Sequence, residues 1–265
     1  GGTGYISRNV IIGDDALVDL NSRNSIYNTI VGSEAGGGTW AGDGTENTVL
    51  GYQAFKGAVN GANYNTILGS QAGKSITTGS ANTGVGQEVL KAITIGQYNV
   101  AIGENTLGAE DVGNFTTAIG YRAGYSQNSD SNNEDTGNTL LGAGAGFYNV
   151  TGTKNTLVGR QAGNGASGQS NSNNTAVGYN SLYAVTTGSE NTAIGRTTLN
   201  SLTTGTRNVT VGMDSGGGTT TGNDNIFIGK NAGAQNVSGD EMVIIGSHAG
   251  FSINHATDAD GTVAI

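Results

Sequence analysis

The chain has 265 residues, of which 48 are glycine and none is proline or cysteine, and its formal net charge at pH 7 is −9. Hydrophobic residues make up only 35% and charged residues 12%, which excludes a conventional domain built on a large core of bulky side chains. The missing cysteines exclude disulfides and cysteine-based metal sites, and the negative charge disfavours nucleic acid as a partner.

The hydropathy of the sequence and its two ends indicate whether the chain spans a membrane and whether it is part of a longer protein. No apolar run approaches the ~20 residues that a membrane span requires, so no membrane insertion is expected in this segment. The chain starts with GGTGYIS, without an initiating Met, and stops at DGTVAI before the next expected glycine. We therefore interpret it as a piece of a longer protein.

A repeat of mostly 17 residues runs along the chain. Its marker glycine falls at positions 13, 32, 51, 69, 86, 103, 120, 142, 159, 178, 195, 212, 229 and 246. With this glycine counted as place 5, place 1 is Asn in twelve of the fourteen units, place 2 is always β-branched and place 4 is always Val, Ile or Leu. A second glycine stands ten residues after the marker in ten units.

Each unit predicts a short strand at places 2 to 4, the first at residues 10–12, the next at 29–31 and the last at 243–245. β-Branched residues two apart share one face of a strand, and the marker glycine then ends the strand at a corner where positive φ costs little. The second glycine is interpreted as another such corner, and Asn at place 1 as a residue that tolerates left-handed geometry or caps the preceding turn. Glycine density and period together exclude helix.

The predicted fold is all-β: a parallel β-roll or β-solenoid of about 14 coils, mostly of 17 residues, forming a single repeat domain over residues 1–265. One coil cannot fold alone, because ordering 17 residues costs on the order of 17–34 kcal/mol of backbone entropy and one buried aliphatic side chain returns ~1.5–3 kcal/mol. Stacking aligns identical places into rows and pairs each strand with neighbours on both sides.

Two aliphatic rows are predicted, on opposite faces of the strands. The place 4 row is interpreted as the coil core and includes Val31, Leu50, Ile102, Ile194 and Ile245. Place 3 is apolar in twelve units, and a single chain with place 4 inside would expose it as a continuous stripe. We interpret place 3 as the seam of a homotrimer, because three chains form the smallest ring that buries an inner edge from every side. The alternative is a second internal layer of a wider single-chain solenoid. The seam residues are Ile30, Val49, Ile67, Leu140, Leu157, Phe227 and Ile244.

The segments NTAIG, NVAIG, NTAVG and NTLVG, followed by YRAG or RQAG and then TTGSEN, resemble the head repeats of YadA-like trimeric autotransporter adhesins. They are still more similar to the arrays of bacteriophage tail fibres, and the resemblance covers residues 9 to 265. It implies a left-handed parallel β-roll, three chains side by side, and a role as shaft or head of an extracellular attachment fibre, on a virion tail or a bacterial surface.

Three insertions interrupt the period, at 36–46, 125–137 and 163–173, and loops that bulge from a solenoid often carry recognition. Trp40, in the first, suits stacking on a sugar or packing against a neighbouring coil or sister chain. The second offers Tyr125, Asp130 and Glu134 as recognition residues. Its alternating Asn128, Asp130, Asn132 and Glu134 resemble a calcium loop but lack the central glycine and the distal glutamate, so a solvated loop without metal is favoured. The third is interpreted as a plain polar loop.

No motif predicts catalysis or a cofactor. Gly69 to Ser75 nearly spells a phosphate-binding loop, but three residues separate its glycines instead of four. His248 and His255 lie near Asp258 and Asp260 without a nucleophile on a sharp elbow. We therefore expect no enzyme, and a partner that is a surface receptor or glycan of a host cell. Two alternatives remain: a monomeric solenoid that binds a repetitive surface such as ice or glycan through its Thr rows, and a solenoid polysaccharide depolymerase.

Overall fold

The computed structural model describes residues 8–17, 19–20, 25–132, 134–251, 253, 261 and 263–265. Within these residues the chain is all-β, and it forms a parallel β-solenoid of about 14 turns with a spacing of about 17 residues. This confirms the fold class predicted from the repeat. The strands are β1 (Val10–Ile12), β2 (Asp19–Leu20), β3 (Thr29–Val31), β4 (Thr39–Trp40), β5 (Thr48–Leu50), β6 (Thr66–Leu68), β7 (Thr83–Val85), β8 (Val100–Ile102), β9 (Thr117–Ile119), β10 (Thr139–Leu141), β11 (Thr156–Val158), β12 (Thr175–Val177), β13 (Thr192–Ile194), β14 (Val209–Val211), β15 (Ile226–Ile228), β16 (Val243–Ile245) and β17 (Val263–Ala264).

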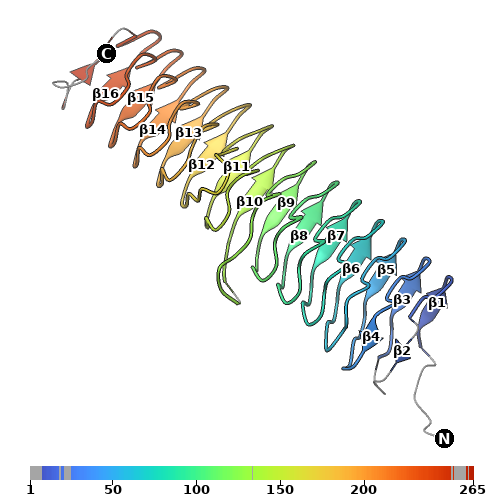
Figure 1. The fold of residues 1–265 in the computed structure, drawn as a ribbon. Coiled ribbons are helices and arrows are strands. Elements are labelled where there is room, and N and C mark those ends of the chain that lie inside the picture. The colour runs from blue at the N-terminus through green and yellow to red at the C-terminus, as the bar shows by residue number, and fades with distance from the viewer. Residues whose placement is uncertain are drawn as a thin grey trace, which may run out of the picture. The chain divides into compact units, whose positions relative to one another are not determined.

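The coils group into two compact units, Gly1–Gly137 and Asn138–Ile265. In the first unit β1, β3 and β5 to β9 pair in parallel along one sheet, and β2 pairs with β4 in a separate two-stranded sheet. In the second unit β10 to β17 pair in the same way. Figure 1 shows the strands of each unit side by side, each followed by a loop that returns the chain to the start of the next strand.

The pairing is in register, so that equal places of the repeat lie opposite one another. In the first unit Thr48 is opposite Thr66 and Leu50 is opposite Leu68. In the second unit Thr175 is opposite Thr192, and Val177 is opposite Ile194. Each place of the repeat therefore forms a continuous row along its unit.

The strand side chain that fills the interior is the one at place 3. The predicted seam residues Ile30, Val49, Ile67, Leu140, Leu157, Phe227 and Ile244 are all at most 1% exposed in the single chain. Their assignment to a seam between sister chains is therefore wrong, because they pack inside their own coil. Side chains along a strand alternate, so neighbouring residues point to opposite faces. This alternation does not show which of the two faces is inside.

The place 4 residues point the other way. Leu50 is 49% exposed, Ile194 40%, and Ile102 and Ile245 37% each, while Val31 is half-buried. The prediction that these five residues form the coil core is wrong. The interior is filled instead by place 3 together with residues of the return segment, such as Leu90 and Ile93 in the first unit and Leu199 and Leu202 in the second.

The marker glycines occupy positive φ, as predicted, and a second constraint acts on them. Gly195 has φ +141°, and a Cβ added there would lie 2.5 Å from the carbonyl oxygen of Gly212 in the next coil. The second glycine of the unit plays a different part from the one predicted. Gly188 and Gly205 do not have positive φ, and a Cβ on Gly205 would lie 2.3 Å from the oxygen of Gly222. At these positions glycine is required by the close approach of neighbouring coils, not by a left-handed corner. Gly61 is the exception, with φ +95° and nothing within 4 Å of an added Cβ.

The Asn row at place 1 lies inside each unit and forms a ladder of amide hydrogen bonds. Asn191 Nδ2 donates to Asn174 Oδ1 at 3.2 Å and to the oxygen of Gly205 at 2.9 Å, while Asn191 Oδ1 accepts from the backbone N–H of Asn208 at 3.0 Å. The left-handed residue of this corner is the preceding one, Glu190, with φ +61°. The row therefore pairs buried backbone groups across coils, which differs from the turn-capping role predicted for it.

Candidate interaction surfaces

The outward face of the sheet carries two rows of side chains without charge. The first, which we call the outer aliphatic row, is place 4 of every strand: Ile12, Val31, Leu50, Leu68, Val85, Ile102 and Ile119 in the first unit, and Leu141, Val158, Val177, Ile194, Val211, Ile228 and Ile245 in the second. None of these residues is buried in the single chain. Soluble monomers rarely leave such a continuous apolar stripe in water.

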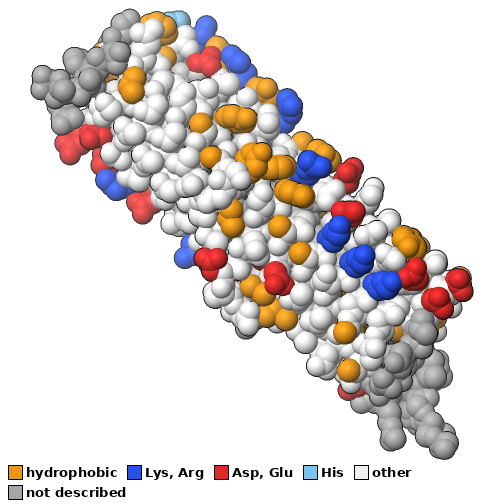
Figure 2. Space-filling model, viewed as in Figure 1, with side chains coloured by type: hydrophobic (Ala, Val, Ile, Leu, Met, Phe, Trp, Pro, Cys, Tyr) orange, Lys and Arg blue, Asp and Glu red, His pale blue; other side chains and the backbone are white. Residues whose placement is uncertain are grey.

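The second row, which we call the threonine row, is place 2 on the same outward face. Thr occupies it in β3, β5, β6, β7, β9 and β10 to β13, and Val or Ile occupies it in β1, β8 and β14 to β16. Thr29, Thr48 and Thr156 are exposed, and the other threonines of the row are half-buried. On the face visible in Figure 2, charged side chains gather toward the edges while the middle is mostly uncharged.

A third row stands one residue before the Asn ladder, at the corner that leads into each strand, and we call it the corner row. Its members are Arg8, Tyr27, Glu46, Tyr64, Ala81, Tyr98, Phe115 and Gly137 in the first unit, and Lys154, Asn173, Glu190, Arg207, Asp224 and Glu241 in the second. From Tyr27 onward their φ angles lie between +55° and +62°. The row is mainly aromatic in the first unit and mainly charged in the second.

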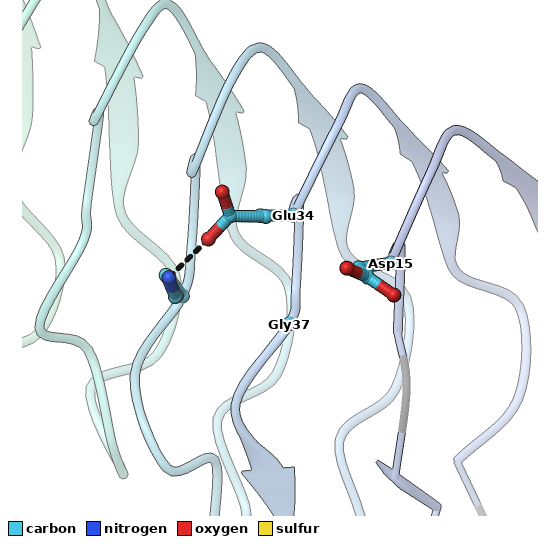
Figure 3. Close-up of a pocket in the computed structure, with 4 residues that line it drawn as sticks. Asp15, Glu34 and Gly37 are labelled. Atoms are coloured by element: carbon cyan, nitrogen blue, oxygen red, sulfur yellow. Dashed lines mark hydrogen bonds and ion pairs between the residues drawn. The ribbon is translucent and has the colours of Figure 1, made fainter.

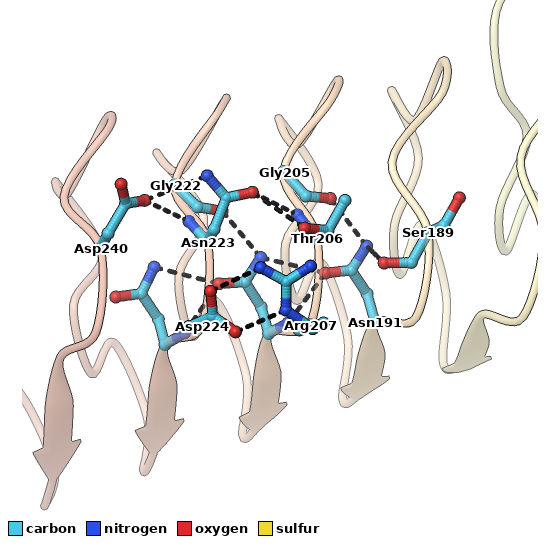
Figure 4. A network of polar contacts seen from close by, with 11 residues as sticks. Ser189, Asn191, Gly205, Thr206, Arg207, Gly222, Asn223, Asp224 and Asp240 are labelled. Atoms are coloured by element: carbon cyan, nitrogen blue, oxygen red, sulfur yellow. Dashed lines mark hydrogen bonds and ion pairs between the residues drawn. The ribbon is translucent and has the colours of Figure 1, made fainter.

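In the second unit, neighbouring members of the corner row form an ion pair. Arg207 Nε and a terminal guanidinium nitrogen donate to the two carboxylate oxygens of Asp224, each at 2.7 Å (Figure 4). Hydrogen bonding to this guanidinium holds the pKa of Asp224 below its usual range, and the carboxylate raises the pKa of Arg207. Because both side chains are exposed, the pair contributes little to stability.

An open pocket of about 280 Å³ is lined by Asp15, Glu34, Gly37 and Lys56 (Figure 3). Lys56 forms an ion pair with Glu34, and Gln53 Nε2 donates to the same carboxylate oxygen at 3.1 Å. The hydrogen bond from Lys56 is the main cause of the lowered pKa of Glu34, and it raises the pKa of Lys56 in turn. The cation is thus already paired within the pocket, which gives no indication of a ligand.

Trp40, predicted as a recognition residue, is fully buried in the first unit. It belongs to β4, its indole Nε1 donates to the oxygen of Gly36 at 3.0 Å, and its ring lies 5.9 Å from that of Phe55. Trp40 therefore packs against an adjacent coil, which is one of the roles predicted for it, and does not stand free for stacking on a sugar. The insertion at 36–46 therefore extends the core of the solenoid.

The loop at 125–137 brings its predicted recognition residues to different surroundings. Asp130 is exposed, and Tyr125 is half-buried with the Arg122 guanidinium 5.3 Å from its ring centre. Glu134 is also half-buried, and its backbone oxygen accepts from the N–H of Asn114 at 2.8 Å. The three residues thus differ in exposure, and Asp130 alone among them is exposed.

A buried carboxylate that the sequence reasoning missed holds this loop against the solenoid. Glu110 is fully buried, and its oxygens accept hydrogen bonds from the N–H of Gly113 at 2.7 Å, from Gln127 Nε2 at 2.8 Å and from Ser129 Oγ at 3.3 Å. Equivalent positions in earlier coils are Ile76 and Ile93. The change from isoleucine in the two preceding coils to glutamate at the same place was the available signal.

The remaining candidates stay apart. In the third insertion, 163–173, Asn164 and Asn171 are buried and Asn173 is exposed on the corner row. His248 is exposed, within 3.1 Å of Asn231 Nδ2 and 3.0 Å of Ser247 Oγ. His255, Asp258 and Asp260 lie outside the described residues. Across the described ranges, no three or more His, Asp and Glu residues are grouped to hold a metal ion.

Comparison with known proteins gives no relative. No family model, no curated protein and no solved structure matches the chain. The part of the chain that the structure describes contains no helix with the length and apolarity needed to cross a membrane.

Proposed function

We propose that the chain is a segment of a homotrimeric, extracellular attachment fibre, in which three β-rolls pack side by side through their outward sheet faces. One observation carries the proposal: the outer aliphatic row leaves Leu50 49% and Ile194 40% exposed in the single chain. Burying such a row on association is favourable by about 25 cal/mol per Å² of apolar surface.

The proposed number of chains is three. In each unit the row lies along one face of its sheet, and three such faces turned toward a common axis form a closed ring that buries all of them. The resemblance of the repeat to phage tail fibres and trimeric adhesins supports this arrangement, a left-handed roll, and a location on a virion tail or a bacterial surface. The proposed partner is a receptor or glycan on a host cell, and the proposed role involves no catalysis.

The solution mass of the native chain tests the assembly. Light scattering after size exclusion should give three times the chain mass of 26.5 kDa, unchanged on dilution to low micromolar concentration. A stable species of one chain mass would contradict the proposal.

A second candidate function is supported by the threonine row. Thr175 and Thr192, and in the first unit Thr48 and Thr66, stand opposite one another in register on the outward face. Hydroxyl and methyl groups at regular strand spacing suit a repetitive surface such as ice. A single-chain mass together with thermal hysteresis of freezing would favour this function, whereas a trimer without hysteresis would exclude it. A reducing-sugar assay on capsular glycans would distinguish the attachment fibre and the surface-binding solenoid from a polysaccharide depolymerase.

A further inference from the structure

The corner row of the first unit carries aromatic side chains that the fold does not use. Tyr27, Tyr64, Tyr98 and Phe115 are 49%, 59%, 54% and 51% exposed. All four have left-handed backbone, with φ between +58° and +62°, which is uncommon for bulky residues. In the second unit the same corner accepts charged residues, so the backbone does not require aromatic rings there. Because the corner row shares this φ in both units, the strain belongs to the coil, and it is the exposed aromatic surface that is typical of a binding site.

Neighbouring members of this row meet face to face across one coil step. The rings of Tyr98 and Phe115 are stacked, with centroids 5.0 Å apart and an interplanar angle of 6°. The guanidinium of Arg8 likewise lies over the ring of Tyr27, 5.2 Å from its centre. At these two steps, the face of a ring points along the stack toward the next coil.

Ala81 leaves a gap in this stack. It stands between Tyr64 and Tyr98 on the corner row, and its methyl group reaches too short a distance to contact either ring face as Phe115 contacts Tyr98. Two strand spacings separate the flanking positions, about 9.6 Å. A ring placed over Ala81 would lie about one coil step from each tyrosine, which is the spacing of the Tyr98–Phe115 stack. The distance between the two tyrosine positions therefore matches the stacking of one ring between them.

The chemistry around the gap selects a neutral ring with apolar faces and a polar edge. Tyr64, Ala81 and Tyr98 carry no charge, and Thr83, two residues after Ala81, brings a half-buried hydroxyl. The hydroxyl of Ser80 already accepts from the N–H of Asn63 at 3.1 Å and donates to the oxygen of Thr78 at 3.2 Å. The net charge of −9 disfavours an anionic ligand. A pyranose ring has two C–H faces for the aromatic walls and hydroxyls around its edge.

We propose that the gap over Ala81, between Tyr64 and Tyr98, binds one pyranose ring of a neutral glycan. This deepens the proposed attachment function by naming the receptor chemistry, and it rests on that function for its biological setting. The binding itself requires no particular number of chains.

The test uses the native chain and three neutral probes: the β-1,4-linked hexasaccharides of glucose, mannose and N-acetylglucosamine. Saturation-transfer NMR should show contact with sugar ring protons for at least one probe, and calorimetry at millimolar probe concentration gives its affinity. Ala81→Tyr fills the gap at a corner that carries tyrosine in neighbouring coils, and it should weaken binding about tenfold or more. Tyr98→Ala, which removes one wall, should do the same. Glu190→Ala, at the same place in the second unit, is the matched control and should bind as the native chain does.

Either of two binding results would overturn the inference: no contact with any of the three probes, or an Ala81→Tyr variant that binds as tightly as the native chain while keeping its melting temperature. Dissociation of the Ala81→Tyr assembly would show that a ring of a sister chain occupies the gap, and would also overturn it. The mass of the native assembly, measured in parallel, distinguishes failure of the glycan site from failure of the proposed trimer. Three chains without glycan binding would remove this inference alone, whereas a single chain that binds would remove the trimer alone.

Discussion

Ile244 and Ile245 are neighbours in β16, yet Ile244 is fully buried inside the coil while Ile245 is 37% exposed on the outward face. The same relationship joins Ala193, which is buried, to Ile194, which is 40% exposed. The interior of each coil is thus complete within one chain, and the exposed neighbour is free to contact another. This division of the two rows is the structural basis of the proposed assembly.

Replacing Ile194 and Ile228 together with Asp should dissociate the assembly and leave the coils folded. Both residues belong to the outer aliphatic row, so two charges per chain would be placed in a buried contact between chains. Light scattering should report one chain mass, and circular dichroism an unchanged β-solenoid. Lys154→Asp together with Asn173→Asp, at exposed corner positions, should leave the mass unaltered. An unchanged mass for the Ile194 and Ile228 variant would locate the contact elsewhere.

Removing one rung of the asparagine ladder should cost about 2–4 kcal/mol of unfolding free energy. In Asn191→Ala the buried oxygen of Gly205 and the N–H of Asn208 both lose a partner. Denaturant unfolding measures the loss. Ser189→Ala removes only an exposed hydroxyl bonded to the oxygen of Thr187, and should stay within about 0.5 kcal/mol of the native chain. Equal stability of the two variants would show that the ladder is dispensable.

A methyl group at the marker glycine should be far more damaging than one at an open glycine. In Gly195→Ala the new Cβ would meet the oxygen of Gly212 at 2.5 Å on backbone with φ +141°, and we expect a loss of about 3 kcal/mol or more. Gly61, with φ +95°, has nothing within 4 Å of its added Cβ. Gly61→Ala therefore bears only backbone strain, about 1–2 kcal/mol. Equal falls in melting temperature for Gly195→Ala and Gly61→Ala would show that the close contact between neighbouring coils is not the cause of the damage.

The Arg207–Asp224 pair gives a pH dependence of known sign. Because the folded-state pKa of Asp224 is lowered, the stabilisation from the pair is fully present above the ordinary pKa of 3.8 and is lost as the pH falls from there through the folded value. In Arg207→Gln the carboxyl titration of Asp224, followed by NMR, should shift upward toward its ordinary midpoint. A titration that does not move would show that Arg207 is not the cause.

The repeat made the strands, their register and the marker glycines predictable, because a 17-residue period and a β-branched pair at places 2 and 4 leave few other folds. It did not reveal which face is inside. The side-chain sizes at places 3 and 9 carried that information. In most coils where place 3 is large, as at Ile67 and Phe227, place 9 is glycine, here Gly73 and Gly233. A Cβ on Gly233 would lie 3.1 Å from the ring of Phe227.

The converse holds for Ala193, whose coil supplies Leu199 from place 9. A large side chain at place 3 is thus matched by a small one at place 9, and the reverse, which indicates that both places lie in the same interior. Place 3 is therefore inside the coil.

The surfaces were harder to predict than the fold. Trp40 was expected on a recognition loop because it stands among polar residues, but loop composition does not show whether a ring turns toward solvent or toward an adjacent coil. Tyr64 and Tyr98 were missed because each looks like an isolated surface aromatic in the sequence. Only the register, which places them on one row with Ala81 between them, makes them neighbours.

The solvent access of the outer aliphatic row in the native assembly is the most direct test of the proposed trimer. The chain has no cysteine, so Ile194→Cys introduces a unique thiol, and Arg207→Cys gives an exposed reference. We predict that the thiol at 194 reacts with a maleimide much more slowly than the thiol at 207, and that oxidation joins chains through position 194 only. Equal labelling rates, with no disulfide-linked chains, would contradict the account.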